Sequence, residues 1–202
     1  VLADPTKCGS VFDPVGVRPF PEPCDIARRT LAQQAIKYEL TPAPAGSAAK
    51  VTVNGKEVAI DGQFAANLAT AAADAGYPKA GDARIVKVGF LNALFNGQAL
   101  TIIAILTVLV IYVTMVYGPI AAALVELFPT RIRYTAMSLP YHIGNGWFGG
   151  LLPATSFAMV AGTGDIYYGL WYPIVIALGT FIIGLLFVPE TKDRDIQTFQ
   201  GN

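Results

Sequence analysis

The sequence predicts an all-α membrane protein with three transmembrane helices, preceded by a small α+β domain that contains one β-hairpin. Of the 202 residues, 53% are hydrophobic and only 14% are charged, whereas soluble domains average about 25% charged. Ten of the fourteen Lys and Arg residues lie before residue 88. The uncharged runs that follow are each long enough to cross a bilayer, which takes roughly 20 residues. The chain therefore divides into residues 1–97 and a membrane part, residues 98–202.

The only two cysteines, Cys8 and Cys24, stand sixteen residues apart in a segment rich in Pro and Gly. They could close a disulfide loop in an oxidising compartment, or remain two free thiols. A single distant histidine, His142, cannot complete a metal site with them, so we expect no metal and no cofactor.

Residues 25–76 contain the elements of the small domain. Asp25 stands at an N-cap position and predicts a helix over 26–38, and Asp61 predicts another over 63–75. Between them, alternating apolar residues over 51–60 flank Asn54-Gly55, which predicts a hairpin with a type I′ turn. Residues 84–95 fit either a strand or an interfacial entry to the first membrane helix.

The three spanning helices are expected near 98–126, 135–161 and 167–188. Gly118 and Pro119 lie inside the first helix, where proline removes one backbone hydrogen bond, so we expect a helix break there. Such a break could line a substrate path or act as a gate, because freed carbonyls in a membrane need protein or water beside them. The alternative is a purely structural kink.

The second span contains the polar groups that we expect to face a substrate or proton pathway, together with Tyr117 of the first span. These groups are Tyr141, His142 and Asn145; an ionisable residue inside a membrane often marks such a pathway. Equally, His142 could be neutral and bonded to a backbone carbonyl, and Asn145 could bond a neighbouring helix. Gly146 and Gly150 form a small-xxx-small pair that predicts close helix packing.

Charged residues at the ends of the spans predict both orientation and a gate. Arg131 and Arg133 in one short turn, with Lys192 and Arg194 in the tail, place that side in the cytoplasm. Residues 1–97 would then lie outside the membrane, on the extracytoplasmic side. Acids and bases at these helix ends could form a network that breaks and re-forms between conformations, or simply anchor the helices at the interface. The expected network is Glu126, Arg131, Arg133 and Glu190.

At these charged ends the sequence resembles the major facilitator superfamily. ELFPTRIR (Glu126 to Arg133) and PETK (Pro189 to Lys192) are similar to motifs in the closing third of its sugar-porter and metabolite:proton symporter branches. The run from Tyr117 to Gly150 is more similar to the symporters, because the Pro-Trp usual after GPI in glucose facilitators is replaced by Ala121-Ala122. The resemblance covers about residues 98–195 and implies transmembrane helices ten to twelve. Residues 1–97 would then be an enlarged external loop.

The resemblance implies that a parent protein moves a small metabolite, such as an organic acid or osmolyte, across the inner membrane by alternating access, coupled to protons. Its partners would be the lipid bilayer, the solute, protons and nine further helices of the parent chain. A zero net charge with no basic cluster excludes nucleic acid. No nucleophile, base or metal cluster suggests an enzyme. The alternative function is a membrane-anchored extracytoplasmic binding or sensory protein.

Overall fold

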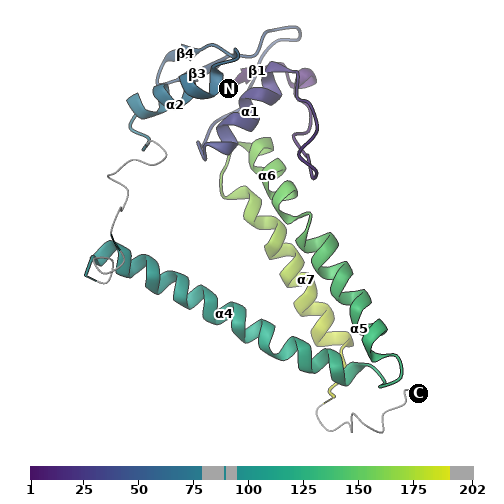
Figure 1. The fold of residues 1–202 in the computed structure, drawn as a ribbon. Helices are drawn as coiled ribbons and strands as arrows, with labels where there is room; N and C mark the ends of the chain where they lie inside the picture. Colours follow the sequence, from purple (N-terminus) through teal and green to yellow (C-terminus); the bar gives the residue numbers. More distant parts are fainter. Residues whose placement is uncertain (79–88, 90–94, 192–202) are drawn as a thin grey trace. The chain divides into compact units, whose positions relative to one another are not determined.

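The computed structural model describes residues 1–78, 89 and 95–191 (Figure 1). By its internal contacts the chain divides into two compact units. The first unit comprises Val1–Lys79 with Gly146–Leu186, and the second comprises Ala80–Asn145 with Phe187–Asn202. Most of the stretch 84–95, for which a strand or an interfacial entry was expected, lies outside the described residues. The same holds for the tail residues Lys192 and Arg194.

Residues 1–78, called here the N-terminal domain, hold short strands and two helices around one small core. Two parallel strands, β1 and β2, pair with each other, and β3 and β4 form an antiparallel hairpin. Asn54 and Gly55 between them both have positive φ, 48° and 82°, as a type I′ turn requires. The elements in order are β1 (Leu2–Ala3), η1 (Pro5–Lys7), α1 (Pro23–Gln33), β2 (Thr41–Pro42), β3 (Val51–Val53), β4 (Lys56–Val58) and α2 (Phe64–Asp74).

The core of this domain lies between α1, α2 and the hairpin. Its buried side chains come from the positions where apolar residues recur at helical or alternating spacing. They are Ala27, Leu31, Val51, Val58, Phe64 and Leu68. A core this small stabilises a domain only modestly, so further links between segments are needed.

Two such links lie near the N-terminus. Cys8 and Cys24 are joined in a disulfide, with their Cα atoms 5.4 Å apart. The buried carboxylate of Asp4 accepts hydrogen bonds from the Gly46 N–H at 2.7 Å and from the Thr6 hydroxyl and N–H at 2.8 and 2.9 Å. These hydrogen bonds, that from Gly46 first, hold the pKa of Asp4 below its ordinary value of 3.8.

The expected N-cap roles of two aspartates are wrong. Helix α1 begins at Pro23 after Glu22, because the fixed φ of proline suits the first helical position. Asp25 therefore lies within the first turn, where its carboxylate accepts the Gly9 N–H at 2.9 Å. Helix α2 begins at Phe64 after Gln63, and Asp61 accepts the Gln63 N–H at 2.8 Å.

The first unit also contains α6 (Leu152–Thr163), η3 (Tyr168–Leu170) and most of α7 (Trp171–Phe187). Gly169 allows close contact with α6, because a Cβ there would lie 2.8 Å from the Ser156 carbonyl oxygen. The Ser156 hydroxyl in turn donates to the Gly169 carbonyl at 3.0 Å. Gly164 ends α6 in the left-handed region, with φ at 77°.

The N-terminal domain docks on the end of α6 through a buried arginine. Arg28 is 7% exposed, and its Nε donates to the Ala161 carbonyl at 2.7 Å while its Nη1 donates to the Gly9 carbonyl at 2.9 Å. The last carbonyls of a helix lack partners within the helix and favour a nearby cation. Arg28 therefore donates hydrogen bonds both to a carbonyl at the end of α6 and to a loop carbonyl of the N-terminal domain.

Residues that follow α1 complete this contact with the turn after α6. The Tyr38 hydroxyl donates to the Ala161 carbonyl, and the Tyr38 N–H donates to the Gly164 carbonyl at 3.0 Å. The Lys37 ammonium lies 3.8 Å from the Asp165 carboxylate. A Cβ at Gly164 would collide with the Tyr38 carbonyl. Burial raises the pKa of Tyr38 above its ordinary value of 10.0. A glycine at position 164 is thus required by both its φ and the docked chain.

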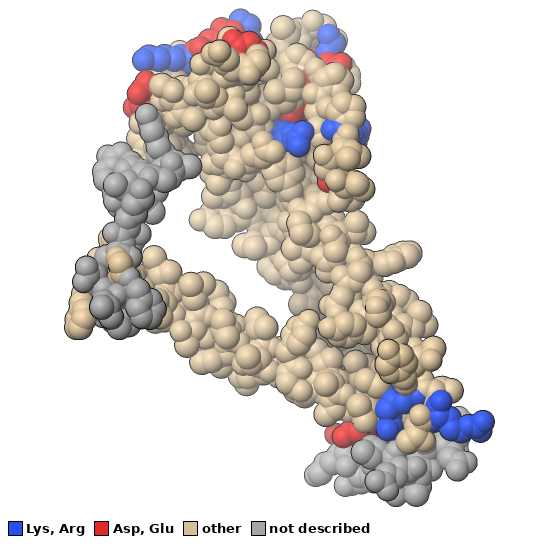
Figure 2. All heavy atoms as spheres, viewed as in Figure 1, with Lys and Arg blue, Asp and Glu red and all other residues tan. Residues whose placement is uncertain are grey.

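The second unit contains α4 (Gly97–Leu127) and α5 (Arg133–His142), and η2 (Ile143–Gly149) follows α5. The Asn96 side chain caps α4 by accepting the Gln98 and Ala99 N–H groups at 3.0 and 3.1 Å. In Figure 2 most of the visible length of α4 shows no charged side chain, and charged side chains gather where it meets α5. Within the described residues, two helical segments are long and apolar enough to cross a membrane, Gly97–Leu127 and Tyr168–Phe187.

Helix α4 continues through Gly118 and Pro119, so it is not interrupted there, and a bend or loosening at these residues stays a prediction. The interruption lies instead in the second expected span, 135–161, where α5 gives way to the π-helix η2 before α6 begins. Pro153 at the start of α6 has no N–H for the Gly149 carbonyl. The clustered glycines before it favour helix weakly. A single α-helix over 135–161 is therefore not formed.

Replacing Arg28 with Ala should weaken docking of the N-terminal domain by about 1–3 kcal/mol, since it removes the Nε donor from the carbonyl of the buried Ala161. The thermal unfolding of the purified intact protein should shift to lower temperature. Arg29→Ala is the matched control, because Arg29 is half-buried and its guanidinium lies over the Phe20 ring at 5.1 Å. Equal losses in the two variants would contradict the docking role of Arg28.

Candidate functional site

The candidate gate lies where α4 ends, and its central contact joins Glu126 to the segment that follows the last helix. Glu126 Oε2 accepts the Thr191 hydroxyl at 2.6 Å, and Thr191 is 8% exposed. The Thr191 N–H donates to Glu190 Oε1 at 3.1 Å. Two carboxylates from chain segments 64 residues apart therefore meet at one buried threonine. Hydrogen bonds to a charged acceptor are among the stronger ones in proteins.

The arginines of the predicted network lie in the turn between α4 and α5. Arg133 is half-buried, and its Nε donates to the Phe128 carbonyl at 3.1 Å, which fixes the turn after α4. Arg131 is exposed. Glu126 and Glu190 thus both contact Thr191, and Arg133 contacts the adjacent turn. Whether the four residues act as a gate remains a prediction.

A second candidate site is an apolar cavity of about 260 Å³ between the end of α4 and one face of α5. Tyr141 and His142 both line it, with their rings in an edge-on contact 6.2 Å apart. His142 Nδ1 lies 2.7 Å from the Ser138 carbonyl oxygen and 3.2 Å from its hydroxyl. Because a carbonyl oxygen only accepts, the contact with the Ser138 carbonyl requires Nδ1 to be the donor, and in a neutral ring Nε2 is then an acceptor. Leu124, Tyr134, Met137 and Ser138 complete the lining.

The structure does not bring the other pathway candidates to this cavity. Tyr117 is 57% exposed on α4, and Asn145 lies beyond α5 in η2. A Cβ built at Gly146 would meet no described atom within 4 Å. Packing at Gly146 and Gly150 therefore remains a prediction about helices outside the described part of the chain.

Sequence reasoning missed two residues of these sites. Thr191 stands inside the PETK motif, and the only local signal for its role is a hydroxyl directly after Glu190. Ser138 lies four residues before His142, and side chains at that spacing share a helix face.

The membrane part of the chain matches a known transporter family. The profile of the sugar (and other) transporter family matches residues 85–201, more than half of the chain. The chain belongs to this family. It is therefore a major facilitator superfamily sequence of the metabolite-transporter type, as the ELFPTRIR and PETK resemblance predicted. No solved structure matches it.

Three relatives illustrate the range of similarity. A Haemophilus influenzae protein described as a metabolite transport protein is 35% identical over 54% of this chain and 25% of the relative. The citrate-proton symporter of Salmonella typhi is 39% identical over 37% of this chain and 17% of the relative. An inner membrane metabolite transport protein of Escherichia coli is 30% identical over 53% of this chain and 24% of the relative. The chain spans about a quarter or less of the length of these curated relatives.

Replacing Thr191 with Val should destabilise the purified intact protein by about 1–3 kcal/mol, because Glu126 loses a hydroxyl donor at a partly buried position. Chemical denaturation followed by tryptophan fluorescence would measure the loss. Thr130→Val is the control, since Thr130 is exposed in the neighbouring turn. The Glu126–Thr191 contact would be unimportant if the two valine variants unfolded at the same denaturant concentration.

Proposed function

We propose that this chain is the C-terminal part of a secondary active transporter that moves a small metabolite across the inner membrane, coupled to protons. The observation that carries the proposal is the family match over residues 85–201, which includes both described helices that could cross a membrane. Relatives named for citrate-proton symport and for glycine betaine and proline transport support a small organic acid or osmolyte as the solute.

The proposed topology has three crossings, with residues 1–97 outside and the C-terminus in the cytoplasm. The second crossing would be made by α5, η2 and α6 in series, and the others by α4 and α7. Arg131 and Arg133 support a cytoplasmic α4–α5 turn. The turn after α6 carries Asp165 and no cation, and the N-terminal domain docks there through Arg28. The Cys8–Cys24 disulfide supports an extracytoplasmic position for the N-terminal domain, because disulfides persist in oxidising compartments.

The proposed mechanism is alternating access with a cytoplasmic gate at the end of α4. In the conformation described here, Thr191 ties Glu126 to the segment after the last helix. Opening toward the cytoplasm would break this hydrogen bond and free Glu126 to pair with an arginine of the turn. An isolated surface ion pair contributes little, so a partly buried network is needed for the switch. Nine further helices of the parent chain would supply the rest of the path.

Within this fragment the cavity beside α5 is the proposed contact with solute or protons. The imidazole of His142 can donate or accept a hydrogen bond, and the Tyr141 hydroxyl beside it can donate one. The Nε2 atom of His142 is not used by the Ser138 contacts. Tyr117 and Asn145 would join the path only through helices of the parent chain.

The alternative, a membrane-anchored binding or sensory protein, is not favoured. A passive anchor would not produce a match to a transporter family across residues 85–201. The transporter family also gives no support for an enzyme.

Replacing Arg133 with Ala in the parent protein should lower proton-driven uptake about tenfold, which corresponds to about 1.4 kcal/mol of lost gate energy. Uptake of labelled citrate and glycine betaine into vesicles with an imposed pH gradient would measure this. Membrane insertion should be unchanged, and Lys50→Ala in the N-terminal domain serves as the matched cation control. Wild-type uptake kinetics in Arg133→Ala would remove the gate role.

The topology can be tested apart from transport by single cysteine substitutions. A membrane-impermeant maleimide added outside the cell should label Ala45→Cys and should reach Thr130→Cys only after the membrane is opened. Labelling of Thr130→Cys from outside would reverse the proposed orientation.

A further inference from the structure

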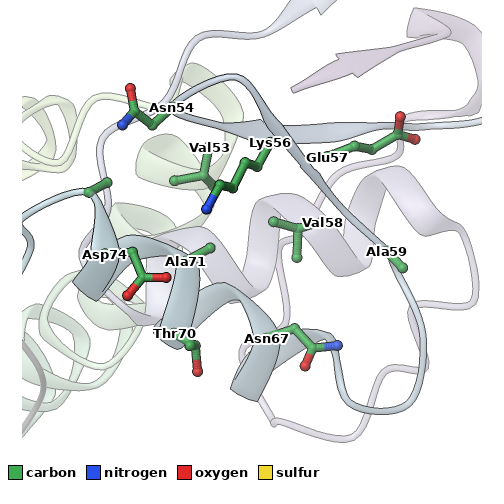
Figure 3. Close-up of a pocket in the computed structure, with 11 residues that line it drawn as sticks. Val53, Asn54, Lys56, Glu57, Val58, Ala59, Asn67, Thr70, Ala71 and Asp74 are labelled. Atoms are coloured by element: carbon green, nitrogen blue, oxygen red, sulfur yellow. The ribbon is translucent and has the colours of Figure 1, made fainter.

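The N-terminal domain has a cavity of about 390 Å³ between its hairpin and α2, shown in Figure 3. Its lining includes Val53, Val58 and Ala71 as apolar groups. Small-molecule sites commonly have volumes from about 300 to 1,000 Å³. With about 30 Å³ per water molecule, this cavity has room for roughly a dozen waters or one small metabolite.

Two opposite charges face this cavity, Lys56 from β4 and Asp74 from the end of α2. In Figure 3 the ammonium of Lys56 points toward the side of α2 that carries Asp74, whereas Glu57 points away. Glu57 is paired with Lys50 at 3.2 Å. Among the described residues, no side chain lies within ion-pair distance of either Lys56 or Asp74. Both charges therefore remain available to a ligand.

The position of Asp74 favours a cation beside it. Asp74 is the last residue of α2, where the helix carbonyls add partial negative charge. A cationic group at this point would be stabilised by the carboxylate and by the helix end together. Asn67 and Thr70, one turn or more earlier on α2, add polar groups to the same lining. The Thr70 hydroxyl donates to the Ala66 carbonyl at 3.0 Å and so keeps its acceptor capacity.

We propose that this cavity, called here the hairpin–α2 site, binds a small zwitterion such as an amino acid or a betaine. The carboxylate of the ligand lies against Lys56, its ammonium group lies against Asp74, and its hydrocarbon part covers Val58 and Ala71. A ligand with one charge would satisfy only one side of the site. This role adds solute capture by the N-terminal domain to the proposed transport, and it does not depend on the transport proposal.

Thiol protection in the intact parent protein tests the site directly. Ala75→Cys places a thiol in the lining, and Cys8 and Cys24 are already joined to each other. We expect saturating L-proline or glycine betaine to slow maleimide alkylation at this position about fivefold or more. Acetate or tetramethylammonium alone, at the same concentration, should not slow the alkylation. Wild-type protein gives the background, and Ala45→Cys, in a turn away from the cavity, should react at one rate throughout.

The charge variants decide the assignment. Lys56→Ala and Asp74→Ala, each combined with Ala75→Cys, should weaken protection about tenfold, as expected for loss of one charge-assisted contact. Lys50→Ala should leave protection unchanged, and an unchanged Ala45→Cys rate in each variant shows that the domain still folds. The proposal is overturned by absence of protection, by equal protection with acetate alone, or by protection that survives both charge variants. Failed solute uptake would leave this readout intact, so the two proposals can fail separately.

Discussion

The first unit depends on one buried contact, the guanidinium of Arg28 at the end of α6. A domain of fewer than 80 residues gains little from its core, and here six buried apolar side chains form that core. Arg28 provides what the core lacks, because it satisfies a helix-end carbonyl and a loop carbonyl at once. Tyr38 and Gly164 extend the same contact, and the absence of a side chain at Gly164 lets the chain approach closely. The small domain and α6 therefore belong to one unit.

The second unit depends on a contact at the end of α4. Glu126 cannot be left without a donor at a partly buried position without a cost in free energy. Thr191 supplies a hydroxyl at 2.6 Å, from a residue that follows the last helix. A hydrogen bond of this kind is strong enough to hold one conformation and weak enough to exchange. The proposed gate would need this balance between its two conformations.

Much of the chain could be predicted from local pattern. The apolar spans, the hairpin around Asn54-Gly55 and the transporter family all follow from residues close together in sequence. The helix start at Pro23 was missed because an N-cap aspartate and a first-turn aspartate have the same local signal, and only the contact of Asp25 with Gly9 separates them. The continuity of α4 through Pro119 agrees with the expected span 98–126, because a long apolar helix can tolerate the cost of one proline.

The sequence by itself determined where this chain can enter a membrane and which family it joins, because hydropathy and short charged motifs are local properties of the chain. Only the tertiary structure decided that Arg28 reaches Ala161 and that Glu126 meets Thr191, across 133 and 65 residues. The tertiary structure likewise decided that the opposite charges of Lys56 and Asp74 face one cavity. Such pairings depend on the path of the backbone between the residues, and no local pattern carries that information.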